Sequence, residues 1–229
     1  MKASRLISFL VIFLLLTSCN SKDKKSFRLA KNKIPETVSV NIPIDKGFSE
    51  YITAYTSGVI PSNSAIEIHF TPEFALKANK SVSDLFEFEP TVKGKTEWRD
   101  ETTLVFTPAH LLKPETTFTV GLNFGKLTDV KEKLKIFPLR IQTVKKDFHV
   151  TIGTLECPDA EGKTYTLNGQ ILTADVIEPE EAENYLTAKL GRKKMLISWD
   201  HSFNLIHKFS IKEIVRTDKA QELLIAWDR

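Results

Sequence analysis

The stretch at residues 85–122 constrains this chain most, because apolar and polar residues alternate through it. Residues 104–107 and 116–122 keep that alternation, and Pro108 and Pro114 stand between the two runs. Successive side chains of a strand point to opposite faces, so each run predicts a half-buried antiparallel strand. Apolar faces of this kind become stable when two sheets pack against each other. The stretch therefore predicts a β-sandwich.

The same alternation recurs on both sides of this stretch. Residues 66–70 form a run that Pro72 stops, and residues 134–144 form another, in which Pro138 favours an edge position or a bulge. Past residue 147 the alternating runs are 148–152, 165–173, 195–199, 209–214 and 223–227. A length of about 190 residues is enough for two small cores. We expect an all-β protein with two tandem sandwich domains, at residues 46–146 and 147–229.

One helix is expected in the second domain, over residues 178–194. Pro179 suits its first turn and Gly191 suits its end. The glutamates between them, Glu180, Glu181 and Glu183, would lie at the positive end of the helix dipole. A metal ion could also gather such glutamates, but the helix start explains them without one, so no metal site is predicted.

The first 18 residues have the layout of a secretory signal. Lys2 and Arg5 precede an apolar run at residues 6–16 that is too short to span a bilayer comfortably. The run ends in Leu-Thr-Ser-Cys, which resembles the lipobox of bacterial lipoproteins, where the signal is cut before a cysteine that carries the lipid. Cys19 is therefore the predicted lipid attachment site, and the membrane is a predicted partner. The alternative is an ordinary cleaved signal with a chance cysteine.

Residues 19–45 are predicted to form a flexible tether. Residues 21–35 are rich in lysine and too poor in apolar residues to build a core of their own. A solvated spacer is the favoured interpretation, and electrostatic contact with anionic lipid head groups is the alternative. The formal net charge of +3 falls to about +1 once Lys2 and Arg5 leave with the signal. Nucleic acid is therefore not an expected partner.

No residue pattern predicts catalysis. The sequence has no G-x-S-x-G, H-E-x-x-H or P-loop motif, so we expect no catalytic residue, no cofactor and no enzyme. Asp200, His201 and His207 form the only plausible divalent-metal grouping, but their spacing matches no closed zinc motif, and we interpret these as ordinary loop histidines. Cys157 has no disulfide partner if Cys19 carries lipid. We interpret Cys157 as a structural cysteine, with a reactive thiol as the alternative.

Several segments resemble the first domains of bacterial alpha-2-macroglobulins and related bacterial immunoglobulin-like domains. They are residues 51–74, the FEFEP sequence ending at Pro90, the W-x-D-x-x-T-L-V-F-T-P sequence from Trp98 and the L-x-P-x-T-x-F-T-V sequence from Leu112. Two positions depart from the usual pattern: Glu115 stands where a turn glycine is common, and Phe118 where a tyrosine is common.

The second half carries the resemblance further. A G-x-x-x-T-x-D pattern falls on Gly169, Thr173 and Asp175, and the I-x-W and I-x-R endings fall on residues 197–199 and 214–216. The resemblance implies that both domains are immunoglobulin-like, or macroglobulin-like, β-sandwiches, the second with one short helix. It covers most of residues 46–229, and the bait region and C-x-E-Q thioester of such inhibitors are absent from this sequence.

The resemblance also implies a function. We expect a membrane-anchored amino-terminal scaffold of an alpha-2-macroglobulin-like protease inhibitor, with proteases or envelope proteins as partners. Its expected location is the bacterial cell envelope, lipid-anchored at the outer membrane on the periplasmic or surface face. The alternative is a freestanding envelope lipoprotein whose immunoglobulin-like domains bind a protein or a glycan.

Overall fold

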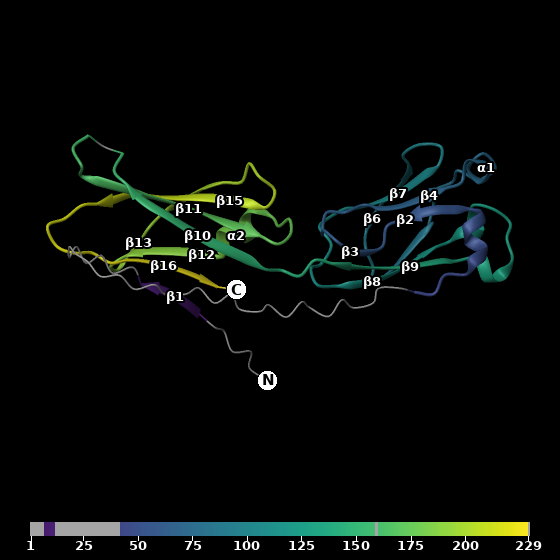
Figure 1. The fold of residues 1–229 in the computed structure, drawn as a ribbon, viewed down its shortest axis with the longest axis horizontal. Helices are drawn as coiled ribbons and strands as arrows, with labels where there is room; N and C mark the ends of the chain where they lie inside the picture. Colours follow the sequence, from purple (N-terminus) through teal and green to yellow (C-terminus); the bar gives the residue numbers. More distant parts are fainter. Residues whose placement is uncertain (1–6, 12–41, 159, 229) are drawn as a thin grey trace, which may run out of the picture. The chain divides into compact units, whose positions relative to one another are not determined.

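The structure is a computed structural model that describes residues 7–11, 42–158 and 160–228, and it is all-β (Figure 1). Its described residues fall into two compact units. The central unit comprises Ser39–Asp147 together with Thr173–Ile177, and the C-terminal unit comprises Phe148–Leu172 and Glu178–Arg229 together with the strand β1 (Ile7–Val11). Paired sheets around a core occur in both units, so the predicted all-β sandwich class is confirmed.

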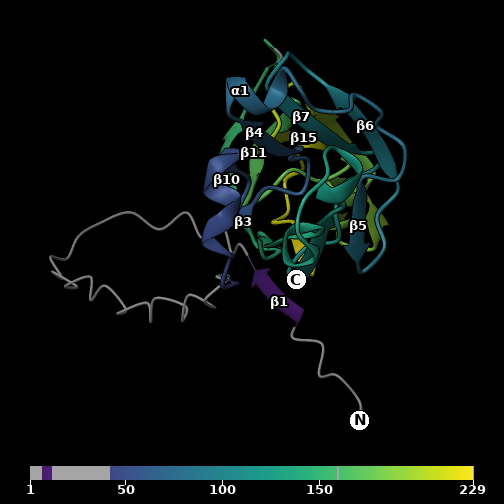
Figure 2. The same cartoon turned by 90° about the vertical axis from the view of Figure 1, so that its right-hand side faces the viewer.

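The central unit consists of two four-stranded sheets, which form two layers in Figure 1. The first has the order β2 (Ile52–Tyr55), β4 (Ile66–Phe70), β7 (Thr103–Pro108) and β6 (Gly94–Trp98), all antiparallel. The second has the order β3 (Gly58–Ile60), β9 (Phe137–Thr143), β8 (Thr117–Leu122) and β5 (Phe86–Glu89), in which only the β3–β9 pair is parallel. Figure 2 shows β5 and β6, one from each sheet, after a quarter turn.

Short helical turns connect the strands of the central unit. They are η1 (Lys46–Glu50), α1 (Pro72–Ala75), η2 (Phe124–Lys126) and η3 (Glu132–Leu134). Pro72 ends β4 as predicted, because it starts α1, where its missing N–H costs no hydrogen bond. Pro138 lies in β9 beyond the residues that pair with β3, so it sits at a locally open edge, as its chemistry requires.

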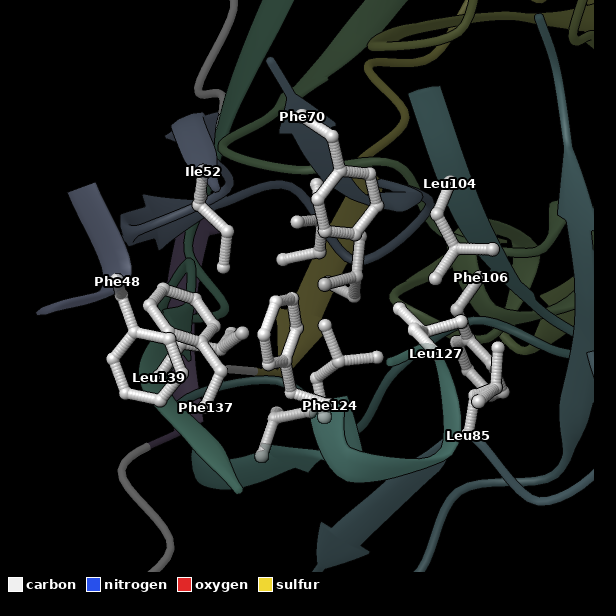
Figure 3. Packing of buried hydrophobic residues seen from close by; sticks show 14 of the residues in the cluster. Phe48, Ile52, Phe70, Leu85, Leu104, Phe106, Phe124, Leu127, Phe137 and Leu139 are labelled. Carbon is white, nitrogen blue, oxygen red and sulfur yellow. The ribbon is translucent and has the colours of Figure 1, made fainter. Parts of the chain in front are cut away.

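The core of the central unit is filled by side chains from the alternating strands and by a group of aromatic rings (Figure 3). Phe124, which is fully buried, lies 5.7 Å between ring centroids from Phe48 and 5.1 Å from Phe74. Ile66, Ile68 and Phe70 of β4 are buried in alternation with more exposed neighbours. The period-two pattern of the sequence therefore records which face of each strand lies inside.

The C-terminal unit also has two four-stranded sheets. One has the order β10 (Phe148–Glu156), β11 (Thr164–Thr173), β15 (Ile206–Val215) and β14 (Ile197–Asp200). The other has the order β1, β16 (Leu223–Asp228), β12 (Leu186–Leu190) and β13 (Lys193–Lys194), with antiparallel pairing throughout. The unit has its own core, in which Ile171, Ile211, Ala188 and Ile225 are completely buried.

The helix expected over residues 178–194 is much shorter than predicted. The helix α2 covers only Pro179–Asn184, and the chain then forms β12 and β13. Leu186 and Ala188 are buried while Thr187 and Lys189 are exposed, an alternation that suits a strand beside β16. The helical interpretation of residues 185–194 was therefore wrong, because pairing with a distant strand outweighed a weak local helical pattern.

Candidate functional site

His207 is the most deeply buried ionisable side chain of the C-terminal unit's strands. It follows the first residue of β15, where buried positions alternate, and it shares the inner face with Phe209 and Ile211. It is 2% exposed, and its Nε2 atom has no hydrogen-bond partner. A buried histidine with one orphan nitrogen is the polar feature of this unit that calls for an explanation.

Among the described residues, His201 is the polar side chain that contacts the ring of His207. His201 follows β14, and its Nδ1 atom lies 2.8 Å from the Nδ1 atom of His207, with the two ring planes at 62°. Trp199 of β14 stacks on His201 at 5.7 Å between ring centroids. The end of β14 and the start of β15 therefore bring together two histidines that stand six positions apart.

Glu183, near the end of α2, completes the cluster. Its Oε1 atom lies 3.3 Å from the Nε2 atom of His201. An ionised carboxylate can only accept a hydrogen bond, so we assign the proton of His201 to its Nε2 atom. If the His201 ring is neutral, its Nδ1 atom is then a hydrogen-bond acceptor. The Nδ1–H of His207 then donates to His201, and the Nε2 atom of His207 faces the apolar core with a lone pair.

This arrangement accommodates no second proton on the buried ring. A proton on Nε2 of His207 would create a buried charge without an acceptor. Burial, and then the neighbouring His201, lower the pKa of His207 from its ordinary value of 6.5. Burial therefore holds the His207 ring in its neutral form, which opposes acidification.

The geometry fits a shared hydrogen bond better than a shared metal ion. Nitrogen ligands of a tetrahedral zinc ion lie about 2.0–2.1 Å from the metal, which separates two of them by about 3.3 Å. The two Nδ1 atoms are closer than that. Within the described residues no group of three or more His, Cys, Asp or Glu side chains could hold a metal ion.

Asp200 precedes the two histidines, which were interpreted as ordinary loop residues, but His207 lies buried within β15, so that interpretation was wrong for His207. Asp200 accepts hydrogen bonds from the hydroxyl and the backbone N–H of Ser202, which lower its pKa. The carboxylate that contacts His201 is Glu183, which stands 18 residues before it. Spacing along the chain could not reveal this partner, because α2 meets the β14–β15 connection only in the folded unit.

The other candidate residues have simpler surroundings. Cys19 lies outside the described residues, so its lipidation stays a prediction. Cys157 follows β10 and is exposed, so the expectation of a structural cysteine is not supported by packing. His110 and His149 are exposed, whereas His69 lies 3.3 Å from the hydroxyl of Thr103.

The G-x-x-x-T-x-D residues have structural environments. An added Cβ at Gly169 would lie 2.3 Å from Cζ of Phe209, so the ring packs directly on the glycine backbone. Thr173 and Asp175 are 4% and 5% exposed. Oδ2 of Asp175 accepts the backbone N–H of Ser62 at 2.8 Å and also its hydroxyl. The contacts of these residues are therefore structural. Residues 173–177 belong to the central unit.

The fold defines a class, an all-β protein of two sandwich-like units, and comparisons with known proteins add little to it. No protein-family model and no curated protein matches the chain significantly. Two crystal structures of L,D-transpeptidase 3 from Mycobacterium tuberculosis are similar to it. The one with a faropenem-derived adduct has 11% identity and a TM-score of 0.30 and covers 75% of this chain and 79% of its own. The one at 1.32 Å has 11% identity and a TM-score of 0.29, with 73% and 78% covered.

At TM-scores this low, the likeness to the transpeptidases carries no argument about activity. Among the described residues no helix is both long and apolar enough to cross a bilayer.

Proposed function

We propose that this chain is a lipid-anchored scaffold of the bacterial cell envelope and the amino-terminal portion of an alpha-2-macroglobulin-like protease inhibitor. Cys19 carries the lipid, and residues 20–45 connect it to the two β units. The chain itself performs no chemistry in this proposal. Its role is to hold the inhibitory parts of a longer protein at a membrane.

The observation that carries the proposal is the bond between Asp175 and Ser62. Asp175 ends the G-x-x-x-T-x-D pattern on which the resemblance of the second half rests. Its buried carboxylate satisfies two donors of Ser62, so the aspartate has a structural reason to stand at that position. Gly169, at the start of the pattern, has one too, because Phe209 occupies the space of a side chain. Both positions thus have a structural reason within this chain, which supports a scaffold role.

We also propose no catalytic role for this chain. The histidine cluster is the only arrangement of the described residues in which two imidazole rings meet, and His207 is 2% exposed. A general base must come within hydrogen-bond reach of its substrate. A ring that is buried beside Phe209 and Ile211 has no such access, which supports a structural role for His207.

The anchor is tested by membrane fractionation of the full chain in a bacterial host. The variant Cys19→Ala is expected to leave the membrane fraction after a high-salt wash, because two or more acyl chains give essentially permanent attachment. The sequence has two cysteines, so Cys157→Ala is a matched control that should stay membrane-bound. Retention of Cys19→Ala in the washed membranes would contradict the anchor.

The link to an inhibitor is tested by the intact mass of the native protein, extracted from its source membranes with an antibody to residues 46–146. A species several-fold heavier than 26.0 kDa is expected if the chain is the front of an inhibitor. A species near the mass of the acylated mature chain would overturn this and favour a freestanding envelope lipoprotein that binds a protein or a glycan.

A further inference from the structure

The strand β16 has two neighbours of very different origin. On one side it pairs with β12, from Leu186↔Trp227 to Leu190↔Leu223. On the other side it pairs with β1, from Ile7↔Asp228 to Val11↔Leu224, as Figure 1 shows. β1 lies within residues 1–18, the segment that resembles a removable signal. The outer edge of β16 is thus covered by a segment that a processed chain does not keep.

One hydrogen bond shows to which side of β16 the N–H and C=O groups of each residue point. The N–H of Gly191, just after β12, donates to the carbonyl of Glu222 at 3.1 Å. Backbone groups of successive strand residues point to opposite sides. Leu224 and Ala226 therefore direct their backbone groups to β12, whereas Leu223, Ile225 and Trp227 direct theirs to the outer edge.

The outer edge offers a defined chemistry. Ile225 is completely buried, and Leu223 and Trp227 pack against the same core. Residues directly opposite in an antiparallel pair lie on the same face of the sheet. A strand that occupies the edge therefore places every second side chain beside this core, which favours apolar residues there. In the register of β1, Leu10 takes the position opposite Ile225, and the sequence Ile-Ser-Phe-Leu-Val of β1 is uncharged throughout.

We propose that the outer edge of β16 is a strand-binding site, which β1 holds in the precursor and which an extended, uncharged apolar segment of a partner protein takes in the mature chain. This rests on the proposed function, since it takes residues 1–18 to be removed before Cys19. An open edge presents unpaired N–H and C=O groups, the template for strand addition. The exchange breaks and forms only hydrogen bonds and apolar contacts.

The test compares amide hydrogen exchange in residues 1–229 and in a chain that begins at position 19 with Cys19→Ser. The probe is a synthetic peptide with residues 7–11 between lysine pairs for solubility. In the shorter chain the amides of Leu223, Ile225 and Trp227 should exchange about tenfold faster or more, and the peptide should slow them again. The amides of Leu224 and Ala226 point to β12 and are the internal control.

Backbone-modified peptides distinguish edge pairing from unspecific apolar binding. In the register of β1, Leu10 lies opposite Ile225 and Ser8 opposite Trp227. N-methylation of the peptide at Leu10 and Ser8 blocks the groups that face β16 and should abolish protection. N-methylation at Phe9, whose N–H points away, should leave protection in place.

Two outcomes would overturn the proposal. One is strong protection of Ile225 and its two edge-facing neighbours in the shorter chain without peptide. The other is equal protection by both methylated peptides. Protected amides of β15 in both chains verify that the unit is folded. The peptide test uses no lipid and no inhibitor. A negative peptide result therefore does not affect the fractionation and mass measurements of the proposed function, and negative results in those measurements do not affect the measured peptide binding.

Discussion

Ser62 donates both its backbone N–H and its hydroxyl to the same oxygen of Asp175, although 113 positions separate the two residues. Oδ1 of the same carboxylate accepts the N–H of Val176 at 2.8 Å. The pair is buried, with Ser62 at 2% and Asp175 at 5% exposure. A buried carboxylate is tolerated only when donors satisfy it. Residues 173–177 therefore belong to the central unit through a specific polar contact.

The variant Asp175→Asn is expected to destabilise the central unit by about 3 kcal/mol. Hydrogen bonds to a charged group contribute about 1.5–3 kcal/mol each, and an amide keeps the shape but lacks the charge. The neutral amide oxygen of asparagine is also a weaker acceptor than the carboxylate oxygen that now receives both the N–H and the hydroxyl of Ser62. Urea unfolding of the full chain, followed by the NMR amide signals of β4 in this unit, measures the effect.

Ser62→Ala provides the matched comparison, because it removes the hydroxyl and keeps the backbone N–H. It should cost less than Asp175→Asn, and the double variant should cost less than the sum of the two. Fully additive losses would show that Ser62 and Asp175 do not interact.

Gly169→Ala is expected to destabilise the C-terminal unit by about 1–3 kcal/mol, because inserting a methyl group into a packed core forces side chains to move. The added Cβ would lie 2.3 Å from Cζ of Phe209, whose ring is 3% exposed. Phe209→Leu in the same chain makes room for the methyl group. Thermal unfolding should therefore show the double variant to be more stable than the sum of the single losses predicts, and a strictly additive result would contradict the close contact.

The alternating pattern was sufficient to predict the sandwich because it reports burial directly. β4 and β8 keep their apolar residues on the inner face, as residues 66–70 and 116–122 indicated, whereas in β7 Val105 on the opposite face is buried as well. Strand pairing between distant segments was not available from the same pattern. Residues 186–190 contain good helix formers, yet they form a strand, because β16 lies beside them.

The sequence singled out both histidines but interpreted them as ordinary loop residues, and the buried position of His207 in β15 shows that this interpretation was wrong for His207. His201 and His207 are close in sequence, and a short connection between β14 and β15 brings them together. Glu183 reaches them from α2, and the burial of His207 depends on the inner face of β15. Charge and spacing could name the histidines, but only packing decides which carboxylate joins them and which ring loses water.

Glu115→Gly is expected to stabilise the central unit by about 0.5–1 kcal/mol. Glu115 has a φ of 50°, a left-handed conformation that costs a residue with a Cβ roughly 1–2 kcal/mol. Glycine avoids this cost, but it loses more conformational entropy on folding, so the net stabilisation is smaller. Glycine is common at this position in the family that the sequence resembles. The Glu115 carboxylate lies 3.6 Å from the Nζ atom of Lys145 on the surface, and losing an exposed ion pair of this kind costs little stability.

Glu115→Ala separates the two effects in chemical denaturation. It removes the surface ion pair but keeps the Cβ, so it should not stabilise the unit. Equal stabilisation by alanine and glycine would show that side-chain charge, and not backbone conformation, is responsible.

Acidification is expected to destabilise the C-terminal unit through His207. Burial and His201 lower the pKa of His207 in the folded state below 6.5, so the unfolded chain binds the proton more readily. Stability therefore rises with pH where the unfolded state holds more protons. The contribution of His207 is complete above about pH 6.5 and is lost as the pH falls from there towards the folded pKa, at no more than about 1.4 kcal/mol per pH unit.

Urea unfolding at pH 8, 7, 6 and 5 measures this dependence, with the NMR amide signals of β15 reporting on the C-terminal unit. Carboxylates also titrate near pH 5, so the comparison is between the natural chain and His207→Gln, each relative to its own stability at pH 8. The variant should lose less stability between pH 7 and pH 5, even if its absolute stability is lower. His149→Gln replaces an exposed histidine and controls for the substitution itself. If His207→Gln and the natural chain have the same pH dependence, protonation of the buried ring does not limit the stability of this unit.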